Sequence, residues 1–211
     1  MSLTLLHWRR RVAALYAAVR AEPDPATGHQ LWQAGRDDLL AHHPQSPVPP
    51  EERAGFAGAR LAPYDPGLRF ELELDPDVEP HRLEVPTATD GVVPFERFAV
   101  VHLPADGPVP GDLEVWWLDS YGGGVFLPVK DGLAGRETYG AGRYLLDTVK
   151  GADLGGEVDV TSGRGTLVVD LNFAYNPSCA YDSAWVCPLA PPGNTLAAPV
   201  QGGELYPVVP A

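Results

Sequence analysis

The 211-residue sequence has little positive charge, and this shortage excludes one class of partner. Fifteen Lys and Arg stand against 28 Asp and Glu, which gives a formal net charge of -13. A nucleic-acid-binding protein needs a basic surface to displace counterions from phosphates. The basic cluster at residues 7–11 is too small to supply one, so we expect no nucleic-acid partner.

Long apolar runs are also missing. A membrane-spanning helix needs roughly 18 nearly uninterrupted apolar residues, and no run approaches that length. At the N-terminus the basic residues follow Leu5 and Leu6, which is the wrong order for a secretory signal, and Arg20 interrupts the next apolar run. We therefore expect a cytoplasmic protein without a membrane partner, in which a persistent disulfide is not the default state.

The N-terminal quarter of the chain has helical periodicity. Apolar residues recur at steps of three and four over residues 6–20, which predicts a helix with one apolar face. These residues are Trp8, Val12, Leu15 and Val19. Two prolines in residues 22–28 end this helix, and a second helix is predicted over residues 29–41. The candidates for its buried side are Leu31, Trp32, Leu39 and Leu40.

The remainder has the period of two that is typical of strands. In residues 68–75, leucines and a phenylalanine alternate with charged residues, which predicts a strand with one buried face. Further strands fit residues 81–88, 95–103, 113–121, 124–130, 142–149 and 166–175. Seven or more strands in series, without intervening helices, predict a mainly β fold: an antiparallel β-barrel or sandwich with two N-terminal helices.

The predicted organisation has two parts and an irregular end. Residues 1–52 form a helical extension packed on the body, and residues 53–211 form the antiparallel β domain. Residues 172–194, "NFAYNPSCAYDSAWVCPLAPPGN", are rich in Asn and Pro and follow the last strong strand. We call this segment the strap, because its prolines stiffen a connection that we expect to cross the β domain.

Two stretches could carry chemistry. Alternation along residues 166–176 places Asp170 and Asn172 on one polar face, which either meets water or lines a pocket. Arg143 follows a glycine pair at a strand entrance. It either forms an ion pair with Asp170, which we favour, or presents its planar guanidinium to a ligand carboxylate or phosphate. Glycines at 120–124 and 139–142 precede no helical pattern and predict hairpin turns rather than phosphate-binding loops.

The two cysteines, Cys179 and Cys187, leave several chemistries open. Their spacing lies outside that of a zinc knuckle, and no histidine is near in sequence, so no metal site is predicted. Two buried thiols are the interpretation we favour. A disulfide, or a nucleophilic cysteine with a histidine supplied by the fold, remains an alternative. The serine-hydrolase motif G-x-S-x-G does not occur.

Three runs, "FLPVKDGLAGRETYGAGRYL", "VVDLNFAYNPSCAY" and "CPLAPPGNTL", resemble the C-terminal signature of an uncharacterised bacterial family, domain of unknown function 1684. "LWQAGRDDLLAHHPQSPV" is similar to its N-terminal element. The resemblance points to Arg36, His43, Ser46, Tyr139, Arg143, Tyr144, Asp170, Asn172, Tyr175, Asn176, Cys179, Cys187, Asn194 and Glu204. Leu133, Ala134, Leu171, Ala190 and Gly193 depart from the family pattern. No activity comes with the resemblance.

These observations favour a small-molecule-binding β-barrel for an anionic ligand. The candidate ligand-binding residues are Tyr139, Arg143, Tyr144, Asp170, Asn172, Tyr175, Asn176, His43 and Ser46. One alternative is a hydrolase-type or metal-assisted enzyme that uses His43, Asp170 and Cys179. Others are a flavin-binding barrel and a purely structural role for the polar residues. The cofactor, any catalytic residue and the oligomeric state are left open.

Overall fold

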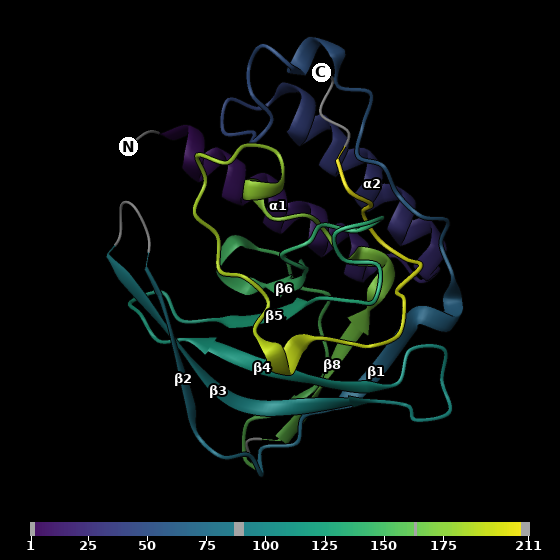
Figure 1. Ribbon diagram of the computed structural model, residues 1–211, viewed down its shortest axis with the longest axis vertical. Coiled ribbons are helices and arrows are strands. Elements are labelled where there is room, and N and C mark those ends of the chain that lie inside the picture. Colours follow the sequence, from purple (N-terminus) through teal and green to yellow (C-terminus); the bar gives the residue numbers. More distant parts are fainter. Residues whose placement is uncertain (1–2, 87–90, 163, 208–211) are drawn as a thin grey trace.

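The computed structural model describes residues 3–86, 91–162 and 164–207 (Figure 1). Helices α1 (Leu3–Ala21) and α2 (Pro25–His42) come first, and eight strands follow in these residues. The strands are β1 (Arg69–Glu73), β2 (His81–Pro86), β3 (Val92–Leu103), β4 (Gly111–Leu118), β5 (Val125–Val129), β6 (Arg143–Asp147), β7 (Val158–Asp159) and β8 (Arg164–Asp170). The helical pair lies on one side of the strands in Figure 1.

Both predicted helices are present, and both are longer than predicted. Asp24 accepts hydrogen bonds from the backbone N–H and the hydroxyl of Thr27, and Pro25 supplies a preset φ at the first turn of α2. The second proline therefore begins a helix instead of breaking one. Trp32, Leu39 and Leu40 are buried as predicted. Leu31 is 43% exposed, so its predicted burial is wrong.

Two antiparallel sheets make up the β part. One has five strands in the order β2-β3-β4-β5-β6, and the other has three in the order β1-β8-β7. A single bridge from Asp75, just after β1, to Val100 of β3 links the two sheets, and a bridge from Tyr144 to Tyr175 links β6 to the strap. The strands of the described residues thus form a mainly β fold of two sheets without a continuous closed barrel ladder.

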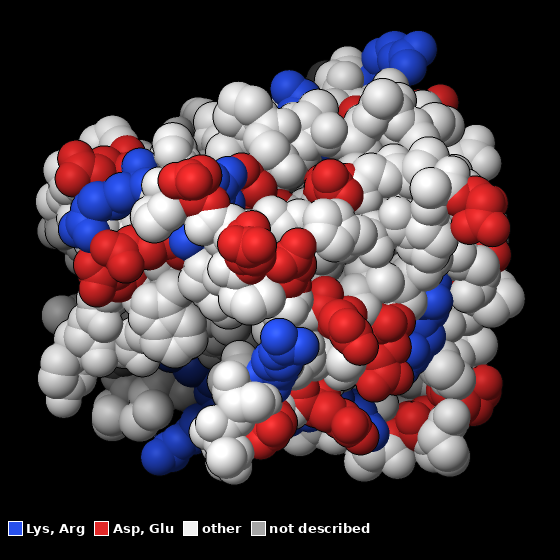
Figure 2. All heavy atoms as spheres, turned by 90° about the horizontal axis from the view of Figure 1, so that it is seen from below, with Lys and Arg blue, Asp and Glu red and all other residues white. Residues whose placement is uncertain are grey.

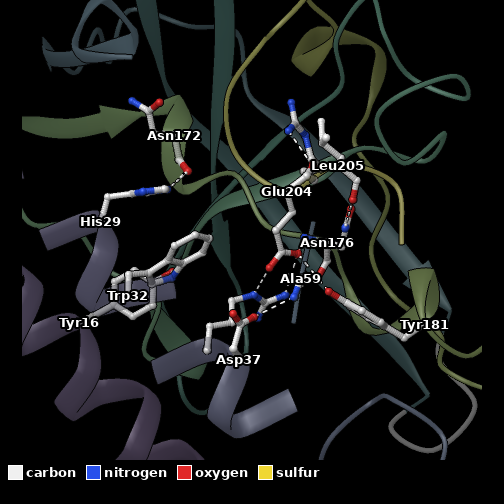
Figure 3. Close-up of polar contacts among 12 residues, drawn as sticks. Tyr16, His29, Trp32, Asp37, Ala59, Asn172, Asn176, Tyr181, Glu204 and Leu205 are labelled. Carbon is white, nitrogen blue, oxygen red and sulfur yellow. Dashed lines mark hydrogen bonds and ion pairs between the residues drawn. The ribbon is translucent and has the colours of Figure 1, made fainter. Parts of the chain in front are cut away.

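The apolar core connects helices and sheets. Tyr16 and Trp32 belong to the same buried cluster as Leu145 of β6 and Val169 of β8. The indole N–H of Trp32 donates to the hydroxyl of Tyr16 at 3.1 Å, which satisfies both groups inside the core (Figure 3). The periodicity of α1 marks its inward face correctly, since Val19 is buried and the rest of the stripe is half-buried.

Strand β8 ends earlier than predicted. The Asp170 carboxylate accepts a hydrogen bond from the backbone N–H of Asn172 at 3.0 Å, which turns the chain into a 3-10 helix over Leu171–Phe173. Alternation beyond Asp170 therefore does not hold. The strap is irregular as expected, with short 3-10 turns at Ser178–Ala180 and Pro192–Asn194. The predicted ends of β2, residues 87–88, and most of the turn at 89–91 lie outside the described residues.

Acidic side chains outnumber basic ones on the face shown in Figure 2, which agrees with the net charge. Arg82 lies near Glu84, Glu96 and Asp119, so part of this acidic surface is paired. In the described part of the chain, no helix is both long and apolar enough to cross a membrane.

Candidate functional site

Arg143 begins β6 and is completely buried. Its guanidinium donates to Asp131 Oδ2 at 3.0 Å and to the carbonyls of Gly202 and Glu204 at 2.6 and 2.9 Å. The predicted ion pair with Asp170 is wrong, because β6 and β8 belong to different sheets while Asp131 lies in the loop that leads into β6. Arg143 attaches residues 195–207, the C-terminal segment, to the five-stranded sheet.

Asp170 and Asn172 lie close together, and neither belongs to the two hollows described below. The amide of Asn172 exchanges two hydrogen bonds with the backbone of Asp65, at 2.8 and 2.9 Å. His29 donates to the Asn172 carbonyl from α2 (Figure 3). Burial raises the pKa of Asp170 to about 6, although Arg69 lies 3.9 Å away. These contacts position the chain that enters β1.

A second buried ion pair joins α2 to the C-terminal segment. Arg36 donates two hydrogen bonds to the fully buried carboxylate of Glu204, and its guanidinium lies 4.8 Å from the ring centroid of Tyr175. Glu204 also accepts from the Asn176 N–H and the Tyr181 hydroxyl, both in the strap (Figure 3). Four hydrogen bonds to one carboxylate hold helix, strap and C-terminal segment together.

His43 and Ser46 follow α2. The Ser46 hydroxyl donates to the Leu40 carbonyl and accepts from the Val48 N–H, which closes the turn after the helix. His43 stacks on His7 with ring centroids 5.2 Å apart. This pair borders a surface hollow of about 440 Å³ between the helices, which includes none of the other predicted residues.

A smaller and more enclosed cavity, of about 100 Å³, brings three predicted residues together. It lies between the two helices, the end of β6 and the strap. The predicted residues in its wall are Tyr144, Tyr175 and Asn176. The apolar stripe of α1, which is half-buried at Trp8, Val12 and Leu15, forms another side of the cavity.

Lys150 and Asp147 also line this cavity, and the sequence reasoning missed them. Lys150 Nζ lies 2.8 Å from Asp147 Oδ2 and 6.0 Å from the ring centroid of Tyr144. The Asp147 carboxylate raises the pKa of Lys150, so the ammonium stays charged at neutral pH. Its side chain is 56% exposed. The cavity therefore presents a solvent-accessible cation next to aromatic rings.

Both cysteines are free, half-buried thiols. The Cys179 backbone N–H donates to Cys187 Sγ at 3.4 Å, and the Tyr139 hydroxyl lies 3.5 Å from Cys179 Sγ. Cys187 reaches the wall of the cavity, whereas Cys179 and Tyr139 lie behind it. The hydrogen bond from Cys187 lowers the pKa of Cys179 to about 6, and Tyr139 adds to this effect.

The residues of the predicted enzyme are not assembled. His43 borders the outer hollow, Asp170 caps the turn after β8, and Cys179 pairs with Cys187 in the strap. Among residues 3–86, 91–162 and 164–207, no group of three or more His, Cys, Asp or Glu is placed to hold a metal ion. Asn194, from the family signature, hydrogen bonds Trp116 and two backbone carbonyls in the core.

Fold and site define a mainly β protein with two antiparallel sheets and a cavity beneath a helical pair. Residues 54–205 match the family model described as "Protein of unknown function (DUF1684)", and the chain belongs to this family. It is also similar to the solution NMR structure of an uncharacterized protein from Haloarcula marismortui, at 30% identity and a TM-score of 0.59. That match covers 85% of this chain and 92% of the other. The comparison with curated proteins finds no match.

Proposed function

We propose that the protein binds a small anionic molecule in the cavity between the helices and β6. The accessible ammonium of Lys150 in an otherwise largely apolar and aromatic wall is the observation that carries this proposal. An ammonium has three donors, and the ion pair with Asp147 occupies one direction. The other donors are free to meet an anion, while the α1 stripe contacts its apolar part.

The volume of the cavity and the charge of Lys150 limit the class of ligand. A cavity of about 150 Å³ holds a benzene molecule, so the cavity of about 100 Å³ suits a slightly smaller compound. Arg36 is already engaged by Glu204, which leaves Lys150 as a point charge. A short carboxylate with a small apolar body fits the small volume and the single point charge, whereas planar bidentate recognition of a phosphate would use a guanidinium.

The cavity gives less support to the alternatives. Pockets for drug-sized ligands measure roughly 300–1,000 Å³, so a flavin ring would require the helices and strap to separate. The hydrolase interpretation needs His43, Asp170 and Cys179 in one place, and they occupy three. A purely structural role explains the contacts of Arg143, Asp170 and Asn172. It does not explain why an accessible cation lies inside a cavity.

Native mass spectrometry of the purified protein, followed by calorimetric titration with short aliphatic and aromatic carboxylates, tests the proposal. Lys150→Met should weaken binding about tenfold or more, because it removes a charged hydrogen bond. Lys130→Met is the matched control: Lys130 is the other lysine of the chain and lies outside the cavity wall. Equal affinity in wild type and Lys150→Met, or no binding of any carboxylate, would overturn it.

A further inference from the structure

We infer that Cys179 and Cys187 form a thiol–disulfide exchange site whose substrates are low-molecular-weight disulfides. Cys179 acts as the attacking thiol and Cys187 as the resolving thiol. The inference goes beyond carboxylate binding and is independent of it. It rests on the Cys187 sulfur, which accepts a hydrogen bond from the Cys179 backbone N–H at 3.4 Å, on Tyr139 as a third group at Cys179, and on the partial exposure of both cysteines.

Cys179 has the surroundings of an attacking thiolate. The Tyr139 hydroxyl lies 3.5 Å from the Cys179 sulfur and 3.2 Å from the Cys179 carbonyl oxygen. Hydrogen bonding by Cys187 and by Tyr139 lowers the pKa of the Cys179 thiol. With a pKa of about 6, most Cys179 is thiolate at pH 7. A thiolate is the nucleophile in exchange with a disulfide, and partial exposure gives the reagent access.

Cys187 has the opposite character before the reaction. Its hydrogen bond to Cys179 and its burial raise its pKa, so it keeps its proton and attacks nothing. Two of the influences that hold this proton come from Cys179: the hydrogen bond and the thiolate charge. Both disappear once the Cys179 sulfur is bonded to another sulfur. The Cys179 N–H and the Lys150 ammonium, which favour the Cys187 thiolate, remain.

The exchange then proceeds in two balanced steps. The Cys179 thiolate attacks one sulfur of a disulfide RSSR, forms a mixed disulfide and expels RS⁻, which takes a proton from water. Cys187 releases its proton to solvent, and its sulfur attacks Cys179 Sγ and expels the second RS⁻. The protein dithiol loses two electrons and two protons to become a disulfide, and RSSR is reduced to two RSH.

The test uses the purified full chain in buffers of oxidised and reduced glutathione, followed by acid quenching, alkylation and intact-mass measurement. Wild type should become lighter by two hydrogen atoms, lose both alkylation sites and recover them in reduced glutathione. This arm needs no variant and no carboxylate. A wild type that stays reduced across the full range of ratios, or stops at a stable mixed disulfide, would overturn the inference.

Variants separate the two roles. Cys187→Ala should stop at one glutathionyl group on Cys179. Cys179→Ala should react more slowly, because desolvation raises the pKa of Cys187 and the Tyr139 hydroxyl contacts the sulfur that the variant lacks. Tyr139→Phe tests a positioning residue. The pH at which the first step reaches half its maximal rate should move upward from about 6. An unchanged profile would remove Tyr139 from the proposal, and equal reactivity of both single-cysteine variants would contradict the assigned order.

Discussion

Arg143 and Lys150 lie seven positions apart, at the two ends of β6 and the turn that follows it, yet their surroundings are opposite. Arg143 is completely buried, with Asp131 and two backbone carbonyls around its guanidinium. Lys150 is 56% exposed and has Asp147 beside it. The buried guanidinium of Arg143 binds Asp131 and two carbonyls through its terminal nitrogens, while its Nε has no hydrogen-bond partner among the described residues, and these bonds hold the fold together. The accessible ammonium of Lys150 in a cavity can instead meet a ligand.

The largest expected effect on stability comes from replacing Arg143. Arg143→Met leaves Asp131 buried without its cation, and we expect the free energy of unfolding to fall by about 3–5 kcal/mol. Urea denaturation at pH 7 measures it. Arg10→Met, on the exposed face of α1, is the control and should stay within about 0.5 kcal/mol. A loss below about 1 kcal/mol for Arg143→Met would show that the buried pair contributes little.

Glu204→Gln tests the second buried pair with a smaller change. Glutamine keeps the shape and one acceptor but leaves the Arg36 guanidinium without its counter-charge, so a loss of about 2–3 kcal/mol is expected. Thermal unfolding and urea denaturation should agree on it. Tyr181→Phe, which removes one neutral donor to the same carboxylate, serves as the matched variant and should cost about 1 kcal/mol. A reversed order of the two losses would argue against the importance of the charge.

Asp170→Asn should act in the other direction. Burial raises the pKa of Asp170 to about 6, so between about pH 4 and pH 6 the folded state binds more protons than the unfolded state. The contribution of Asp170 to the free energy of unfolding therefore falls as pH rises from about 4 to about 6. Asparagine keeps the acceptor for the Asn172 N–H and should add about 1–2 kcal/mol at pH 7 but nothing near pH 4.

The control for Asp170→Asn is Asp159→Asn. A hydrogen bond from Ser162 lowers the pKa of Asp159, so its loss should destabilise the fold at neutral pH. Denaturation curves between pH 4 and pH 8 compare the two variants. If the free energy of unfolding depends more steeply on pH in Asp170→Asn than in wild type, burial does not destabilise the Asp170 carboxylate, and the prediction is wrong.

The smallest expected effect on stability comes from replacing Lys150. Lys150→Met removes a half-exposed cation from the buried carboxylate of Asp147. Because Lys150 lies in contact with solvent, water can take its place at Asp147, and the free energy of unfolding should fall by no more than about 1 kcal/mol. The same substitution should abolish most carboxylate binding. If Lys150→Met loses carboxylate binding but not stability, Lys150 serves ligand binding, whereas Arg143 serves the fold. A loss as large as that of Arg143→Met would instead make Lys150 part of the structural framework.

The strands and helices could be predicted because burial repeats along the chain with the period of each element. The alternating leucines before Asp75 and the stripe of α1 depend on neighbours four residues away or fewer. Three of the predicted site residues, Tyr144, Tyr175 and Asn176, do line the cavity. The family resemblance points to all three.

What could not be predicted depends on distant or very local geometry. The partner of Arg143 comes from a loop, where Asp131 has no periodic signal. Asp170 ends its own strand through a side-chain hydrogen bond, so the alternation used to assign faces does not apply to the residues that follow. Lys150 faces the cavity only because a 3-10 turn follows β6. Lys150 follows Asp147 by three residues, a spacing that brings side chains together in a helical turn. Because a strand was predicted over residues 142–149, this spacing did not indicate a contact.

The hydrogen bonds of Arg143 also constrain the order of events during protein synthesis. Its acceptors at Gly202 and Glu204 are translated some sixty residues after it, and Glu204 is also the counter-charge of Arg36, 168 positions earlier. A nascent chain that has reached the strap holds the Arg36 guanidinium without its counter-charge, and the Arg143 guanidinium with Asp131 but without its two carbonyl acceptors. Native packing on the ribosome therefore has to wait for the C-terminal segment, and contacts this distant in sequence also slow refolding of the complete chain.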